Sequence, residues 1–249
     1  MIAQISLGGF NIKLYGVIIA ISIFAAWYLI RRRSQAYKIE PKIIDDMFLW
    51  VVLGGIVGAR IYHVLSSWDY YQKNLNEIFF VWQGGLGIFG ALLAGLLIIY
   101  IYCKKHKIDF LKFLDLISPA ILLAQGIGRW GNFFNQEAFG MPTNLPWGIK
   151  IPLEQRPLVF LNYERFHPTF FYEFVWDAIG ALVLIKLSPR LKKGQVFGLY
   201  LIIFGVGRLF VETLRFDTWQ VTGVKVAYLF SVVFIIFGFK LLRSAHVKG

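Results

Sequence analysis

The chain has 249 residues, of which 57% are hydrophobic and only 16% are charged. This composition supplies too little polar surface for a soluble domain of this size, and apolar runs long enough to cross a bilayer recur along the chain. The net charge of +12 would suggest nucleic acid in a soluble protein. Here the basic residues lie in short loops between apolar segments, so we interpret them as orientation signals and expect no nucleic-acid partner.

In chain order, the sequence predicts seven membrane-spanning helices, which makes the fold class an all-α integral membrane protein. The predicted spans cover residues 12–30, 44–67, 84–103, 113–127, 169–187, 196–214 and 224–242. Residues 128–168 contain five prolines and are predicted to form an irregular cap, as an insertion within one transmembrane domain over residues 1–249.

Lys and Arg residues concentrate in the regions 31–42, 104–112, 188–195 and 240–249. The positive-inside rule therefore places the C-terminus in the cytoplasm and the N-terminus and the cap outside. Arg31, Arg32 and Arg33 follow the first apolar stretch, whereas basic residues precede that of a signal peptide, so we expect a retained helix.

With this topology, six ionisable groups within or at the ends of the predicted spans lie at one depth, near the outer leaflet, and each is costly enough to need a reason. The set comprises Arg60, His63, Arg129, Glu173, Arg208 and Glu212. Guanidinium groups bind phosphate well, and at this depth the available phosphate belongs to a lipid head group. Structural alternatives stay open: Arg208 and Glu212 have i,i+4 spacing and can pair with each other, Tyr15 can be an interfacial anchor, and His63 can be a packing residue.

The densest polar signal runs from Gly128 to Gly140, where the fourth predicted helix ends. It combines glycines, which allow close backbone approach, with Arg129, Asn132, Asn135 and Glu137. A well-built turn would explain the glycines and asparagines, but it would not also require an arginine and a glutamate.

This segment resembles the signature of the prolipoprotein diacylglyceryl transferase family, a family of bacterial inner-membrane enzymes. Further blocks agree in the same order along the chain: Leu14-Tyr15-Gly16, Gly58-Ala59-Arg60, Gly84-Gly85-Leu86, Asp115 with Pro119, His167-Pro168-Thr169, Tyr172-Glu173, and Gly207-Arg208 with Glu212 and Arg215. A signature followed by collinear blocks is far more specific than a lone glycine motif.

The resemblance implies that the diacylglyceryl group of phosphatidylglycerol passes to the lipobox cysteine of a prolipoprotein signal peptide, with a thioether formed and glycerol-1-phosphate released. It implies a multi-pass enzyme of the bacterial inner membrane with its active site toward the outer leaflet. No cofactor is implied, and no Cys, His and carboxylate cluster has metal-ligand spacing. The expected catalytic residues are Arg129, Arg208, His167 and Glu137. The expected phosphatidylglycerol-binding residues are Tyr15, Arg60, Arg129, Asn132, Asn135, Gly140, Arg208, Glu212 and Arg215.

Two positions depart from the family pattern. Many members carry a histidine where this chain has Phe89, and a tyrosine where it has Phe204. The thiol still has to ionise, which leaves two alternatives open. Either His167 accepts the proton, or the clustered arginines favour the thiolate directly.

Two rival functions use the same residues. A lipid or anion transporter would need polar groups through the full depth of the membrane, for which Asp115 and Asp177 are the main candidates. A non-enzymatic assembly subunit would need none of the chemistry. Neither rival would release glycerol phosphate from lipid and a lipobox peptide.

Overall fold

The computed structural model describes residues 4–7 and 10–244. The α-helices are α1 (Leu14–Ser34), α2 (Pro41–Ser66), α3 (Trp68–Tyr71), α4 (Ile88–Lys105), α5 (Phe110–Asn135), α6 (Thr169–Leu187), α7 (Gln195–Leu214) and α8 (Val226–Ser244). Three antiparallel hairpins pair β1 (Gln4–Leu7) with β2 (Phe10–Lys13), β3 (Ile149–Lys150) with β4 (Arg165–Phe166), and β5 (Gln220–Val221) with β6 (Val224–Lys225). Short 3-10 turns cover Gln35–Tyr37, Leu75–Phe79, Val81–Gln83, Leu153–Gln155, Leu158–Phe160 and Ser188–Arg190.

The seven long helices coincide with the seven predicted spans, and the predicted all-α membrane fold is confirmed. Within the described residues, six helices are long and apolar enough to cross a membrane. The helix α6 has sufficient length, but it carries Glu173, Asp177 and Lys186 and falls outside that set. The number of spans and the orientation of the chain stay predictions.

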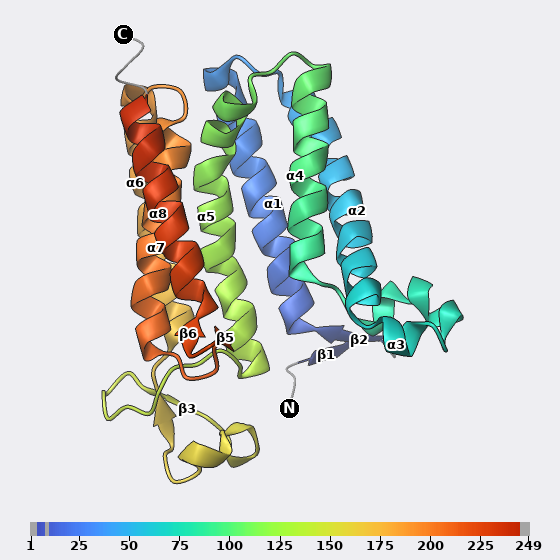
Figure 1. Cartoon of the computed structure of the whole chain (residues 1–249), viewed down its shortest axis with the longest axis vertical. Helices are drawn as coiled ribbons and strands as arrows, with labels where there is room; N and C mark the ends of the chain where they lie inside the picture. The colour runs from blue at the N-terminus through green and yellow to red at the C-terminus, as the bar shows by residue number, and fades with distance from the viewer. Residues whose placement is uncertain (1–3, 8–9, 245–249) are drawn as a thin grey trace. The chain divides into compact units, whose positions relative to one another are not determined.

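The chain divides into two compact units. Residues 30–113 form one of them, in which α2 packs along α4 (Figure 1). Residues 1–29 and 114–249 form the other, which contains most of α5 together with α6, α7 and α8. The expected single domain over residues 1–249 stays a prediction.

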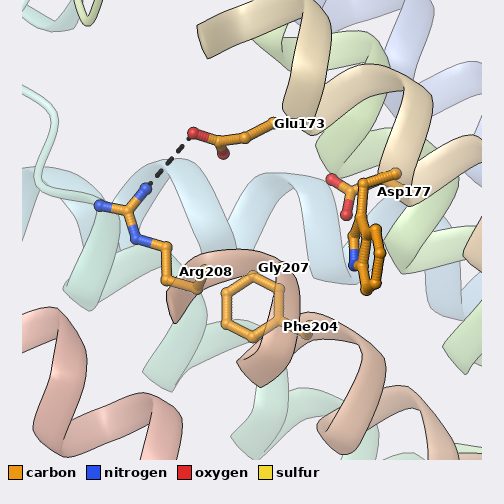
Figure 2. A pocket seen from close by; sticks show the side chains of 6 residues that line it. Glu173, Asp177, Phe204, Gly207 and Arg208 are labelled. Atoms are coloured by element: carbon orange, nitrogen blue, oxygen red, sulfur yellow. Dashed lines mark hydrogen bonds and ion pairs between the residues drawn. The ribbon is translucent and has the colours of Figure 1, made fainter. Parts of the chain in front are cut away.

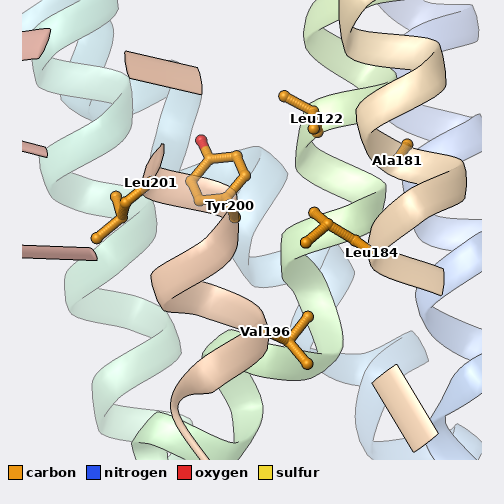
Figure 3. Packing of buried hydrophobic residues seen from close by; sticks show 6 residues of the cluster. All are labelled: Leu122, Ala181, Leu184, Val196, Tyr200 and Leu201. Atoms are coloured by element: carbon orange, nitrogen blue, oxygen red, sulfur yellow. The ribbon is translucent and has the colours of Figure 1, made fainter. Parts of the chain in front are cut away.

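A hydrophobic cluster ties α5, α6 and α7 together in the second of these units. Figure 3 shows Leu122 of α5 facing Leu184 of α6, with Val196 and Tyr200 of α7 closing the group. All four side chains are at most 9% exposed, so this part of the unit buries its apolar surface in protein. The packing fixes the three helices that carry the candidate site.

Asp115 explains how the start of α7 is held against α5. Its Oδ2 accepts a hydrogen bond from the Gly194 backbone N–H at 2.5 Å, and its Oδ1 accepts one from Phe197 at 2.8 Å. Backbone N–H groups at a helix start lack partners within the helix, so a carboxylate there satisfies them and complements the helix dipole. This buried carboxylate therefore has a structural use.

The helix α5 is longer than the sequence predicted. The expected span ended at residue 127, but α5 continues to Asn135 and includes most of the glycine-rich signature. The predicted cap therefore becomes irregular only after Asn135. It has its own small core of Phe139, Ile151 and Phe166, to which β4 contributes Phe166. Figure 1 shows β3 in this part of the chain, where it pairs with β4.

Candidate functional site

Two arginines from different helices meet on one carboxylate. Arg129 of α5 places Nε 2.5 Å from Glu173 Oε2 of α6, and Arg208 of α7 places Nη1 3.5 Å from Glu173 Oε1. Arg208 Nη2 also lies 2.9 Å from Glu212 Oε2 on its own helix. We call Arg129, Glu173, Arg208 and Glu212 the arginine–glutamate cluster. It lies where α5 ends, α6 begins and α7 ends, which is the end of these helices next to the cap.

The two arginines differ in how many donors they have left. Among the described residues, only the Nε of Arg129 is engaged, so Nη1 and Nη2 retain their N–H groups for a ligand. Arg208 is engaged on both terminal nitrogens, and its pairing with Glu212 is the structural i,i+4 contact that the sequence left open. Because the Glu212 side chain is fully buried, this pair also neutralises a carboxylate inside the protein.

A small open pocket lies beside the cluster. Glu173, Trp176 and Asp177 line it from α6, and Phe204, Gly207 and Arg208 line it from α7. Figure 2 shows the Arg208 guanidinium reaching toward Glu173, with the Phe204 ring and the Asp177 carboxylate deeper along the same two helices. The pocket lining therefore combines one cation, Arg208, with two carboxylates, Glu173 and Asp177.

The signature ends in a turn that Glu137 organises. Its Oε1 accepts hydrogen bonds from Asn132 Nδ2 at 2.9 Å and Asn135 Nδ2 at 3.3 Å. Gln136 and Ala138 adopt φ values of 53° and 55°, a left-handed conformation that costs a residue with a side chain some energy. The two amides hold Glu137 between these strained positions, so all three predicted residues act in one turn at the end of α5.

Tyr15 and Gly140 are two predicted binding residues whose positions depend on close packing. A Cβ added to Gly131 would lie only 2.7 Å from Cδ2 of the Tyr15 ring. The helix α1 therefore approaches α5 closely at the signature. A Cβ on Gly140 would meet the Leu214 carbonyl oxygen at 2.9 Å and the His167 Cβ at 2.8 Å. Glycine at 140 thus lets three segments meet beside the cluster.

His167 belongs to a hydrogen-bonded chain in the cap. Trp147 Nε1 donates to the Tyr172 hydroxyl at 2.9 Å, and that hydroxyl lies 3.2 Å from His167 Nδ1. If the Tyr172 hydroxyl donates its proton to Nδ1, then the Trp147 indole, the Tyr172 hydroxyl and the His167 Nδ1 all have hydrogen-bond partners. In that case, neutral His167 carries its ring proton on Nε2. Partial burial lowers the pKa of His167 below its ordinary value, so the neutral form is favoured.

Arg215 lies just beyond the C-terminal end of α7. It forms a bidentate contact with Asp217, from Nε at 3.1 Å and Nη2 at 3.2 Å. Lys225 Nζ donates to the Glu212 and Arg215 carbonyl oxygens at 2.6 and 2.8 Å, which places a cation at the helix end. These contacts fix the backbone immediately after Glu212.

Arg60 belongs to the unit of residues 30–113, and its contacts lie within that unit. Nε donates to the Ile78 carbonyl oxygen at 2.8 Å, and Nη1 donates to Gly84 and Gly85 at 2.8 and 3.2 Å. Nη2 donates to Glu77, and the guanidinium lies 5.2 Å from the Tyr71 ring centroid. Arg60 therefore holds the loop between α3 and α4 and retains one of its five N–H donors, so its phosphate-binding role stays a prediction.

Sequence reasoning did not include Glu173 among the expected site residues, although the cluster is built on it. A signal was present, because Glu173 and Asp177 are two acids one turn apart in an otherwise apolar span. Their convergence with Arg129 and Arg208 required knowing which faces of α5, α6 and α7 meet.

Comparison with known proteins decides the family. The family model described as prolipoprotein diacylglyceryl transferase matches residues 2–243. The chain belongs to this family. A member from Nostoc sp., named phosphatidylglycerol--prolipoprotein diacylglyceryl transferase, is 40% identical over 98% of this chain and 89% of its own length. Proteins of the same name from Acaryochloris marina and Thermotoga maritima are 41% and 39% identical, over 93% and 96% of this chain and 85% and 84% of their own lengths.

Membership of the prolipoprotein diacylglyceryl transferase family gives the cluster a chemical context. Enzymes of this name act on an anionic phospholipid, and the cluster combines two cations with uncommitted N–H donors on Arg129. The transporter reading loses support, because Asp115 is used as a helix cap.

Proposed function

We propose that the protein transfers the diacylglyceryl group of phosphatidylglycerol to the cysteine thiol of a prolipoprotein and releases glycerol-1-phosphate. One observation carries the proposal beyond family membership. Arg129 and Arg208 converge from α5 and α7 on one carboxylate, and this arrangement forms an anion site before any substrate arrives. A preorganised site costs no rearrangement at the moment of reaction.

The reaction matches what two guanidinium groups supply. Attack by sulfur on the glyceryl carbon breaks the bond from that carbon to a phosphate oxygen, and the departing phosphate gains negative charge. Arg129 has both terminal nitrogens available for a bidentate contact with that phosphate, and Arg208 adds a second cation nearby. Positioning two membrane-held substrates against each other provides much of the remaining acceleration.

The neighbouring predicted residues take supporting roles in this proposal. Asn132, Asn135 and Glu137 shape the turn that receives the head group, and the buried Oδ1 of Asn135 has no hydrogen-bond partner among the described residues. Tyr15 covers the signature helix at Gly131. The remaining members of the site are Gly140, His167, Glu212 and Arg215.

We place the reaction at the outer leaflet of the bacterial inner membrane, with the lipobox cysteine of a signal peptide as the acceptor. The basic residues at the start of α7 and the end of α8, which include Lys192, Lys193 and Arg243, support this orientation through the positive-inside rule. The arginine–glutamate cluster lies at the opposite ends of these helices.

The direct test is product identification. The purified protein in lipid nanodiscs receives phosphatidylglycerol and a lipobox peptide, and mass spectrometry follows the peptide while a phosphate-ester assay follows the released head group. One glycerol phosphate per thioether-modified peptide is expected, with neither product from a peptide carrying serine in place of cysteine. Transfer of intact lipid without glycerol phosphate would support a transporter and contradict the proposal.

A further inference from the structure

Asp177 is a buried acid that none of the roles above uses. It lies one turn along α6 from Glu173 and is only 6% exposed. Among the described residues, no hydrogen bond or ion pair reaches its carboxylate, whereas the comparably buried Asp115 has two backbone donors. A buried, unpartnered carboxylate within a membrane protein costs several kcal/mol, so its presence calls for a use.

The packing around Asp177 points its carboxylate into the pocket beside the arginine–glutamate cluster. A Cβ on Gly126 of α5 would lie 3.0 Å from the Asp177 Cβ, so α5 closes one side of the residue. Trp176 donates its indole N–H to the Ile203 carbonyl oxygen at 2.9 Å and forms a fixed wall. Asp177 lines the same pocket as Arg208, and Figure 2 shows both side chains together with Glu173 and Phe204.

The charged and titratable groups around Asp177 come from all three neighbouring helices. Arg129 of α5 and Glu173 of α6 act on it electrostatically, Arg208 of α7 lines the same pocket, and it acts on Tyr200 of α7. Tyr200 donates to Gln125 at 3.4 Å and not to Asp177. The two arginines are turned toward Glu173 and Glu212, so the oxygens of Asp177 remain free to accept a proton.

The position of Asp177 relative to the arginines suits the direction of the reaction. In a displacement at carbon, the nucleophile approaches from the side opposite the leaving group. In the proposed reaction Arg129 and Arg208 hold the phosphate, and the reacting carbon and then the thiol lie farther from the cap along α6. Four residues along a helix correspond to a rise of about 6 Å, which places Asp177 about that far beyond Glu173 in this direction.

We propose that Asp177 is a catalytic residue that accepts the proton of the attacking thiol, an inference that rests on the proposed transferase function. The S–H proton passes to an Asp177 oxygen as the sulfur forms a bond to the glyceryl carbon. The bond from that carbon to the phosphate oxygen breaks, and its electron pair leaves with the phosphate, which the two arginines stabilise. The proton on Asp177 then returns to the departing phosphate or to water.

The alternatives for the base are weaker on the same structural grounds. His167 Nδ1 is engaged by the Tyr172 hydroxyl, which lies 3.2 Å away. Phe204 lines the pocket with a ring that cannot transfer a proton. Asp177 is therefore the acid in the pocket with both oxygens uncommitted.

The test measures thioether formation between pH 6 and 9.5 with Asp177→Asn, which keeps the size of the side chain and removes its basicity. Loss of a general base lowers the rate by about 10²–10⁴-fold, so we expect kcat at pH 7 to fall at least about 100-fold, with KM for phosphatidylglycerol unchanged. The deficit should shrink as pH approaches the ordinary thiol pKa of about 8.5.

A peptide with selenocysteine in the lipobox distinguishes a catalytic base from a residue that only supports the structure. A selenol is already ionised at neutral pH and needs no base, so the variant and the wild-type protein should modify this peptide at equal rates. Asp177→Glu, which keeps a carboxylate, should retain the wild-type pH profile at a reduced rate. Asp115→Asn is the matched control, because it removes another buried carboxylate and should lower thermal stability while leaving the pH profile unchanged.

Five results would overturn the inference. Wild-type activity in Asp177→Asn would exclude a base, and a raised KM with unchanged kcat would indicate a contact with head-group hydroxyls instead. Failure of the selenocysteine peptide to restore the rate, or loss of the pH profile in Asp177→Glu, would indicate a structural role. A wild-type protein that forms no thioether would overturn the proposed function itself, and this inference with it.

Discussion

The Arg129 Nε and the Glu173 Oε2 lie 2.5 Å apart, which joins the end of α5 to the start of α6 by an ion pair. The same Glu173 carboxylate reaches Arg208 of α7, so one acid positions both proposed phosphate-binding residues. Without the Glu173 carboxylate, the repulsion between the two positively charged guanidinium groups would be offset less. In our proposal, Glu173 therefore positions the two guanidinium groups that bind the incoming phosphate.

Replacing Glu173 tests this positioning. Glu173→Gln should lower the free energy of unfolding by about 3–5 kcal/mol, because it removes the anion of the partly buried Arg129 and one of the two anions of Arg208. Added phosphatidylglycerol should raise the thermal midpoint more in this variant than in the wild type, since the lipid phosphate supplies the missing charge. Glu154→Gln, an exposed change in the cap, is the control. An equal lipid-induced rise of the thermal midpoint in both variants would show that the lipid phosphate does not replace Glu173 as the anion beside the arginines.

The sequence predicted the helices well because apolar length decides which segments cross a bilayer. It placed the end of α5 too early, because the glycines just after the predicted span, Gly128 and Gly131, are typical of turns. In the folded chain, Gly131 instead allows α5 to pack closely against Tyr15, just as Gly126 allows it to pack against Asp177. Such glycines cannot be interpreted without the neighbouring helix.

Only part of the site could be predicted, because the sequence does not show which faces of the helices meet. Arg129 and Arg208 meet on Glu173, in agreement with the shared depth that the sequence suggested for these three residues. Asn132, Asn135 and Glu137 form a turn of their own at the end of α5. The pairing of Arg129 with Glu173 and the loop-holding contacts of Arg60 depend on which helix faces meet. A single sequence contains the residue types but not those faces.

His167→Gln tests the role of the cap histidine. The substitution should slow the reaction only modestly and leave the shape of the pH–rate profile unchanged, because His167 Nδ1 is already engaged by Tyr172. If activity at neutral pH vanished and returned at high pH, His167 would be the base.

Stability should also respond to pH through His167. Its pKa is lowered in the folded state by burial, so the unfolded chain binds a proton more readily. The stabilising contribution is present above the ordinary pKa of about 6.5 and declines as pH falls below it. The wild type should therefore lose more thermal stability than His167→Gln between pH 7.5 and 5.5.

The orientation of the chain can be tested at the C-terminal end of α4. Cys103 is only 1% exposed and is a poor target for labelling, whereas the neighbouring Lys105 is exposed. In a Cys103→Ser background, Lys105→Cys should resist a membrane-impermeant thiol reagent in spheroplasts and react once the membrane is permeabilised. Labelling from the outside would reverse the topology and move the cluster to the cytoplasmic leaflet.

The most direct measurement of the central claim compares turnover of Arg129→Lys and Arg208→Lys with that of the wild type, in nanodiscs containing phosphatidylglycerol and a lipobox peptide. Lysine keeps the positive charge but loses the bidentate geometry, so both variants should fold yet release glycerol phosphate at least about 100-fold more slowly. Arg156→Lys in the cap, where the guanidinium donates to the Ile151 and Leu161 carbonyl oxygens, should retain activity. Near-normal turnover in both cluster variants would contradict phosphate binding by these arginines.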